Sequence, residues 1–164
     1  MKWREWEGRK KDFEAELKAG FPMLYEGLGV HWREGGMLGG IGVGPGWWDI
    51  IREVSQGLES LMKQEPTFKL KVVQVKEKYG GLRFYVDKIG GSYWDNNESE
   101  HTFLEDAEPK QAYEKATQLI RKAERESLTT CEYCGAKEAY MSDYSSWLKT
   151  LCTECHEERK ESGR

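Results

Sequence analysis

The four cysteines of the chain are the residues whose type and spacing most clearly indicate chemistry. All four lie in the last 34 of 164 residues, as Cys131-Glu132-Tyr133-Cys134 and Cys152-Thr153-Glu154-Cys155, with seventeen residues between the two pairs. Two residues between two thiols let one tight turn direct both sulfurs to a common point, and a second such turn completes a tetrahedron. The pattern therefore predicts a Zn²⁺ ion held by Cys131, Cys134, Cys152 and Cys155.

The predicted zinc is structural, because four thiolates leave no coordination position for water or substrate. Gly135, directly after the first pair, provides the backbone freedom that such a turn needs. Two disulfides or an iron cluster could use the same four cysteines, although clustered cysteines in a cytosolic chain favour a metal over disulfides. His156 follows Cys155 and could replace it as the fourth ligand.

A second group of residues could bind an anion. The segment Gly44-Pro45-Gly46-Trp47-Trp48 places glycines just before a predicted helix, where free N–H groups and the positive end of the helix dipole suit a phosphate. The Gly-Lys-Ser/Thr of a Walker motif does not follow. The alternative is that Gly46 permits a tight turn and that Trp47 and Trp48 anchor the helix in the core.

The predicted hairpin that follows is basic inside an acidic protein. Residues 68–88 contain six basic and two acidic residues, a net charge of +4, whereas the whole chain has a net charge of −4. Tyr79, Phe84 and Tyr85 lie among these cations, a combination that can clamp phosphates and stack on a base. The alternative is a solvated strand whose lysines prevent edge-to-edge aggregation.

The predicted ligand contacts come from both segments. We expect Lys76, Lys78 and Arg83 to contact phosphates, Trp48 and Tyr85 to stack, and Gly44 and Gly46 to donate backbone hydrogen bonds.

The residues give no positive case for an enzyme. His31 and His101 have no spacing that forms a catalytic triad or a metalloprotease motif, so we expect ordinary surface histidines. The six acidic residues between 89 and 108 are too numerous to indicate one acid–base pair. We therefore expect a non-enzymatic protein.

Composition limits the remaining classes. A chain with 38% hydrophobic and 12% aromatic residues can fold as one globular domain despite 33% charged residues. Its negative net charge disfavours non-specific binding to nucleic acid or to an anionic membrane. The N-terminus lacks the apolar core of a signal peptide, and no stretch approaches a membrane span, so we expect a cytoplasmic protein.

The elements that must position these residues follow from hydrophobic periodicity. The pattern predicts an α+β fold with three helices on a small antiparallel sheet and a C-terminal zinc ribbon. The adjacent Val72 and Val73 indicate that both faces of the first strand are partly covered. A loop is expected over 89–108, with a short strand near Tyr93. The expected helices cover 3–18, 47–64 and the segment from Pro109, and the expected strands cover 68–77 and 82–87. The glycine-rich loop is expected over 27–46. The main domain is expected over 1–126 and the zinc-ribbon segment over 127–164.

Three motifs resemble small uncharacterised proteins of bacteriophages and prophages. They are the hairpin Val75-Lys76-Glu77-Lys78-Tyr79-Gly80-Gly81-Leu82-Arg83-Phe84-Tyr85, the Ala-Glu-x-x-Ser segment at Ala123-Glu124-Arg125-Glu126-Ser127, and the zinc knuckle pair. The resemblance covers about residues 44 to 155, and the glycine run from Gly35 to Gly44 departs from it. Those proteins have no assigned activity, so the resemblance implies a phage accessory protein in the cytoplasm of an infected or lysogenic host.

Together these features lead us to expect an anti-defence factor that sequesters a phosphate-containing nucleotide signal, with a homodimer left open. One alternative is a zinc-ribbon adaptor for nucleic acid or a host polymerase. Between Cys131 and Cys155 the only cations are Lys137 and Lys149, against four acidic residues, so nucleic acid is the less expected partner. Another alternative is direct inhibition of a host protein through exposed Trp94, Tyr140, Tyr144 and Trp147.

Overall fold

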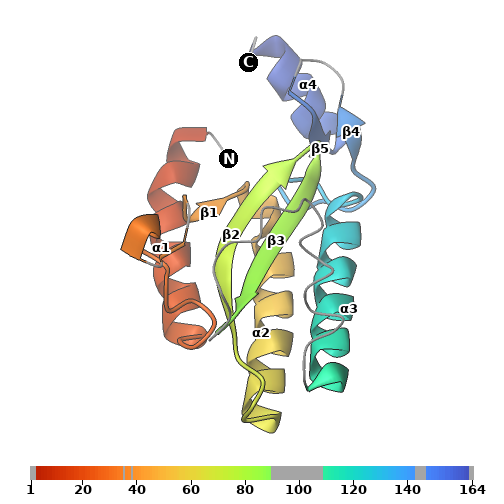
Figure 1. Ribbon diagram of the computed structural model, residues 1–164. Helices are drawn as coiled ribbons and strands as arrows, with labels where there is room; N and C mark the ends of the chain where they lie inside the picture. Colours follow the sequence, from red (N-terminus) through yellow and green to blue (C-terminus); the bar gives the residue numbers. More distant parts are fainter. Residues whose placement is uncertain (1–2, 35, 38, 90–108, 143–146, 163–164) are drawn as a thin grey trace.

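The computed structural model describes residues 3–34, 36–37, 39–89, 109–142 and 147–162. The described part forms a three-stranded sheet with helices packed against it and a small C-terminal module at one end (Figure 1). The α-helices are α1 (Trp3–Gly20), α2 (Trp48–Gln64), α3 (Lys110–Ser127) and α4 (Thr153–Glu161), and the strands are β1 (Ile41–Gly42), β2 (Leu70–Lys78), β3 (Gly81–Lys88), β4 (Tyr140–Ser142) and β5 (Lys149–Leu151). The α+β class is confirmed.

The main sheet is mixed, and the expectation of a purely antiparallel sheet is wrong. Its order is β1-β2-β3, with β2 and β3 antiparallel and β1 parallel to β2. The third strand comes from the glycine-rich segment, where Ile41 and Val43 are buried on either side of the exposed Gly42. Dense glycine disfavours a strand locally, but burial of these two apolar side chains against β2 outweighs that preference.

A β-bulge explains the adjacent valines of β2. The pairing steps from Val72↔Val86 to Gln74↔Tyr85, which leaves Val73 as the extra residue. The bulge returns Val75 to the same buried face as Val72, and Val75 lies opposite the buried Phe84. Residues from Gln74 to Lys78 and from Arg83 to Tyr85 therefore divide cleanly between a core face and an outer face.

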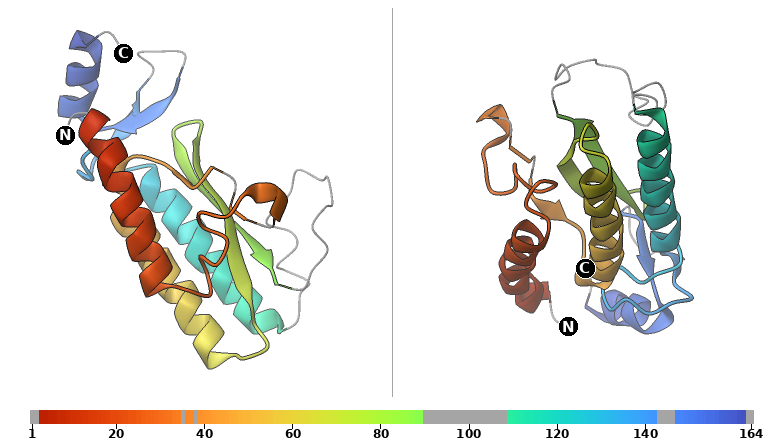
Figure 2. Two further views of the ribbon diagram at one scale, coloured as in Figure 1. Left: turned by 90° about the vertical axis from the view of Figure 1, so that its left-hand side faces the viewer. Right: turned by 90° about the horizontal axis from the view of Figure 1, so that it is seen from below.

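Helices α2 and α3 pack against the core face of the sheet (Figures 1 and 2). Both carry an apolar stripe at helical spacing, as expected from the sequence. The buried residues of the stripes are Ile50, Ile51, Val54, Leu58 and Met62 in α2, and Ala112, Ala116, Ile120 and Ala123 in α3. Helix α1 lies alongside β1 and packs Phe13 and Leu17 into the same core.

Side chains from the helices cover both edges of the sheet. At the β1 edge, the backbone N–H of Ile41 donates to Glu14 Oε1 of α1 at 2.9 Å. At the β3 edge, Leu82 N–H donates to Ser127 Oγ at 2.9 Å and Phe84 N–H to Glu124 Oε1 at 3.3 Å. The Ala-Glu-x-x-Ser segment thus closes an edge that could otherwise pair with another chain.

The C-terminal module stands at the end of the sheet where the β2–β3 turn, the start of α2 and the end of α3 meet (Figure 1). It consists of the β4–β5 hairpin and α4, a helix that the three-helix expectation missed. Helix α4 was missed because it is short and charged, and only His156 among its residues is buried. The expected strand near Tyr93 and the expected surface position of His101 lie outside the described residues.

Among the described residues, every helix is too short or too polar to cross a membrane.

Candidate metal centre and ligand face

The four cysteine sulfurs form one cluster. The Sγ atoms of Cys131, Cys134, Cys152 and Cys155 all lie within 4.8 Å of one another. The cysteines are free thiols, and Cys134 Sγ lies 3.6 Å from Cys152 Sγ, well beyond a disulfide bond. A tetrahedron with Zn–S bonds of about 2.3 Å has edges of roughly 3.8 Å, so the cluster matches the size of a zinc site. The predicted cluster is confirmed, and it could hold a metal ion for which zinc is the natural choice.

Local backbone hydrogen bonds shape the two Cys-x-x-Cys turns, which are the first knuckle (Cys131–Cys134) and the second knuckle (Cys152–Cys155). In the first, Cys131 N–H donates to the carbonyl of Ala136 at 2.8 Å and Gly135 N–H donates to the carbonyl of Cys131 at 2.9 Å. Gly135 has a φ of 80°, in the left-handed region that favours glycine. The second knuckle is the first turn of α4, because Cys152 is its N-cap and His156 N–H donates to the carbonyl of Cys152.

The electrostatics of the cluster suit a cation. Burial raises the pKa of Cys134, and burial together with the neighbouring Cys131 thiol raises the pKa of Cys155. At Cys152 burial also acts to raise the pKa, but hydrogen bonds from the Cys155 backbone and the neighbouring thiols outweigh it and leave the pKa lowered. Four thiolates this close repel one another, and a divalent cation removes that penalty.

His156 lies outside the sulfur cluster. Its Nδ1 is 2.8 Å from the hydroxyl oxygen of Ser142, and the side chain is buried beside Tyr140. Its hydrogen bond therefore holds β4 against α4, and the alternative in which His156 replaces Cys155 gains no support.

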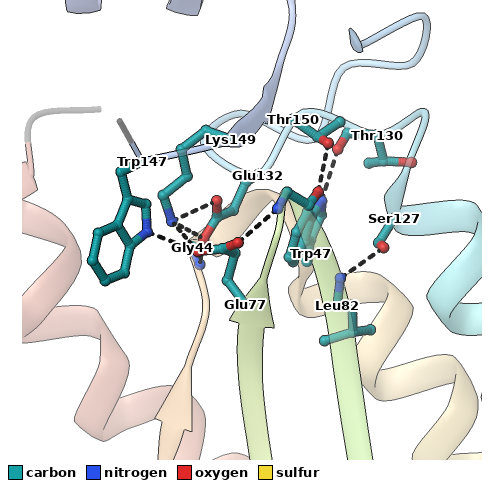
Figure 3. Close-up of polar contacts among 11 residues, drawn as sticks. Gly44, Trp47, Glu77, Leu82, Ser127, Thr130, Glu132, Trp147, Lys149 and Thr150 are labelled. Carbon is teal, nitrogen blue, oxygen red and sulfur yellow. Dashed lines mark hydrogen bonds and ion pairs between the residues drawn. The ribbon is translucent and has the colours of Figure 1, made fainter. Parts of the chain in front are cut away.

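The first knuckle docks directly onto the segment from Gly44 to Trp47 (Figure 3). Gly44 N–H donates to Glu132 Oε1 at 3.1 Å, Gly46 N–H donates to the carbonyl of Glu132 at 2.8 Å, and Trp47 Nε1 donates to the carbonyl of Thr130 at 2.7 Å. The two glycines predicted as anion donors thus already have acceptors within the protein. They are glycines because the knuckle backbone occupies the space of a side chain.

A buried charge cluster joins the knuckle to the hairpin, and the sequence reasoning missed it. Lys149 Nζ lies 2.9 Å from Glu132 Oε1, 2.8 Å from Glu132 Oε2 and 3.6 Å from Glu77 Oε2. The side chains of Lys149, Glu132 and Glu77 are only 13%, 2% and 6% exposed. Burial raises the pKa of Glu132, and the Lys149 ammonium opposes that rise.

Backbone and indole donors complete this cluster. Glu77 accepts from Trp147 Nε1 at 2.9 Å and from Gly80 N–H at 2.7 Å, and Thr150 Oγ1 donates to the carbonyl of Gly80 at 2.6 Å (Figure 3). No local sequence signal identifies these partners, because Glu77 and Glu132 are 55 positions apart.

We expect Lys149→Met to destabilise the protein by about 3–5 kcal/mol, because it leaves two buried carboxylates without their counter-ion. The matched control is Lys137→Met, which removes an ion pair with Glu126 whose side chains are 63% and 32% exposed. That exposed pair contributes about 1 kcal/mol or less. Denaturant unfolding of both variants measures the difference, and equal losses would contradict the role given to Lys149.

Trp48 does not offer a stacking face to a ligand. The residue is 5% exposed, and its ring stacks on Phe13, with the ring centroids 4.5 Å apart and an interplanar angle of 9°. Trp47 and Trp48 are both buried, as expected if they anchor the start of the helix in the core.

The predicted hairpin residues do converge. Lys76 and Arg83 are direct cross-strand partners, and Lys76 Nζ lies 4.9 Å from the centroid of the Tyr85 ring. Lys78 shares this outer face by the alternation of the strand, and its Nζ lies 5.7 Å from the ring of Tyr79 in the turn. The predicted ligand residues therefore fall into two groups: Lys76, Lys78, Arg83 and Tyr85 share one surface, whereas Gly44 and Gly46 pack against the knuckle and Trp48 lies in the core.

Comparisons of the chain with protein-family models, with curated proteins and with solved structures found no match.

Proposed function

We propose that this chain is a non-enzymatic binding protein that holds a phosphate-bearing nucleotide on the outer face of β2 and β3. The observation that carries the proposal is the cross-strand pair of Lys76 and Arg83 with the Tyr85 ring beside it. Two cations on one face can bind a phosphate by charge-assisted hydrogen bonds, and the neighbouring aromatic ring can stack on a base.

Supporting this location, two cations near the C-terminal module pair with carboxylates, whereas Arg83 on the hairpin face donates from Nη1 to the carbonyl of Leu82 at 2.8 Å. Lys149 is held by buried carboxylates and Lys137 by Glu126. None of the proposed ligand residues lines the shallow hollow between α2 and α3, whose lining includes Ile50, Val54 and Leu119. The proposed site is thus the outer face of the hairpin and not the C-terminal module.

In this proposal the zinc holds the hairpin turn and the start of α2 in place and takes no part in ligand binding. The phage resemblance of the hairpin and knuckle motifs supplies a context, an accessory protein that sequesters a nucleotide signal of the host defence. Sequestration needs only tight binding, which agrees with a site that holds cations and an aromatic ring without an acid–base pair.

Isothermal titration of the zinc-loaded protein against cyclic nucleotides and ADP-ribose derivatives tests the proposal. We expect at least one ligand to bind. The double variant Lys76→Glu with Arg83→Glu should lower the affinity for this ligand by at least about tenfold, because each charged contact contributes about 1.5–3 kcal/mol. The control is the double variant Lys63→Glu with Lys115→Glu, which makes the same change of net charge at exposed helix positions. Absence of binding across the panel would refute a small-nucleotide ligand, and equal losses in the two variants would refute the assignment of the site to Lys76 and Arg83.

A further inference from the structure

We infer that the nucleotide ligand of the hairpin face is a single-stranded nucleic acid and that Tyr79, at the tip of the hairpin, is an outer stacking platform for its bases. The inference rests on the proposed function, since it assumes that this face binds nucleotides, and it adds the class of ligand and a further binding residue.

The backbone of Tyr79 is the first observation. The pair Lys78↔Gly81 closes a two-residue turn whose central residues, Tyr79 and Gly80, have φ values of 53° and 76°. Such a turn strongly prefers Asn-Gly, because a bulky side chain is strained at positive φ. Tyrosine is therefore an unfavourable choice for the turn itself.

Burial does not compensate for this strain. The Tyr79 side chain is 69% exposed, the largest value among the exposed large hydrophobic residues of the described chain. Strained residues that persist without a packing reason point to a function. A large, exposed aromatic ring beside the Lys78 ammonium is the kind of surface on which a nucleobase stacks.

The order of groups along the hairpin is the second observation. Next to the Tyr79 ring in the turn, the outer face presents Lys78, then the Lys76–Arg83 pair, and then Tyr85 opposite Gln74. The rise of about 3.4 Å per residue places Gln74 and Lys78 roughly 14 Å apart. One phosphate cannot contact groups at both ends of this line. A strand of alternating phosphates and bases can place phosphates at the central cations and bases at the two tyrosines.

The residues around the turn hold its backbone in place and leave the Tyr79 ring accessible. A Cβ atom at Gly80 would lie 3.4 Å from Met141 Cε, and one at Gly81 would lie 3.1 Å from Leu128 Cδ2. The side chains of Met141 and Leu128 thus pack against the turn, and Thr150 holds the carbonyl of Gly80. The turn that carries Tyr79 is therefore packed against the C-terminal module and the end of α3, and a pre-positioned ring loses less entropy when a nucleobase stacks on it.

Fluorescence anisotropy with a labelled twelve-nucleotide oligo-thymidylate, and with its oligo-uridylate counterpart, tests the inference on the zinc-loaded full chain. We expect the oligonucleotide to bind at least tenfold more tightly than thymidine monophosphate. Its affinity should fall as the salt concentration rises from about 50 to 200 mM. Tyr79→Asn should raise the melting temperature, because Asn-Gly suits the turn. The same variant should lower the affinity for the oligonucleotide by about tenfold. Tyr79→Phe should retain the affinity, and Tyr140→Asn, at a 44% exposed tyrosine of β4, should leave it unchanged.

The outcomes separate the inference from the proposed function. If the small nucleotides of the titration panel bind as tightly as the oligonucleotide and Tyr79→Asn affects neither, the inference fails while the proposed function stands. Should neither class of ligand bind, both fail. A rise in melting temperature with no loss of oligonucleotide affinity would also overturn the role of Tyr79, and would point to a protein partner at the turn instead.

Discussion

Cys131→Ser is expected to reduce zinc from one ion per chain to a small fraction and to destabilise the whole protein by at least about 3 kcal/mol. Cys131 is fully buried at the point where the knuckle meets Gly46. Structural zinc sites contribute apparent binding free energies of about 10–16 kcal/mol in small domains, and this binding energy becomes folding energy because the site is absent from the unfolded chain. The expected loss is far larger than that of a surface substitution.

Metal analysis by mass spectrometry and denaturant unfolding with and without chelator measure this effect. Glu154→Gln serves as the control, because the residue lies within the second knuckle but its side chain is exposed. It should retain the zinc and the stability. A Cys131→Ser protein with full zinc content would contradict the assignment of the four ligands. If chelation abolished nucleotide binding while leaving the melting temperature unchanged, the zinc would have a functional role and not a structural one.

Gly46→Ala is expected to destabilise the protein by about 3–5 kcal/mol, a large effect for a single methyl group. Its Cβ would lie 2.0 Å from the carbonyl oxygen of Cys131 and 2.4 Å from the backbone nitrogen of Gly135. Both are backbone atoms of the knuckle, so the clash can be relieved only by moving the module away from the start of α2. That movement would also break the Gly46 hydrogen bond to Glu132 and expose Trp47.

This variant distinguishes two roles for the glycine. Alanine keeps the backbone N–H, so a glycine that only donated to an anion would tolerate the change. The control is Gly8→Ala in α1, where a Cβ meets nothing within 4 Å and the higher helix propensity of alanine should add roughly 0.5–1 kcal/mol. Thermal unfolding of the two variants should therefore shift in opposite directions. A melting temperature of Gly46→Ala close to that of the unchanged protein would refute the packing that we describe.

Local spacing along the chain is enough to predict several features of this protein. The two Cys-x-x-Cys turns identified the sulfur cluster, because two residues between thiols suffice to converge them wherever the module lies. The apolar stripes of α2 and α3 identified the core helices, and the glycines after Tyr79 identified the hairpin turn. The sequence also singled out Lys76, Arg83 and Tyr85, although their shared face follows from the pairing of β2 with β3.

Other features depend on contacts between segments that are far apart in the chain, and local patterns do not predict them. Gly44 and Gly46 suit an anion by local rules, but the knuckle nearly ninety residues later supplies their acceptor and fills their side-chain space. Trp48 could serve a ligand or the core by local rules, and the ring of Phe13 from α1 stacked on it places it in the core. Glu77, Glu132 and Lys149 carry no local signal of burial, because an ion pair forms in the interior only where the fold brings compensating charges together.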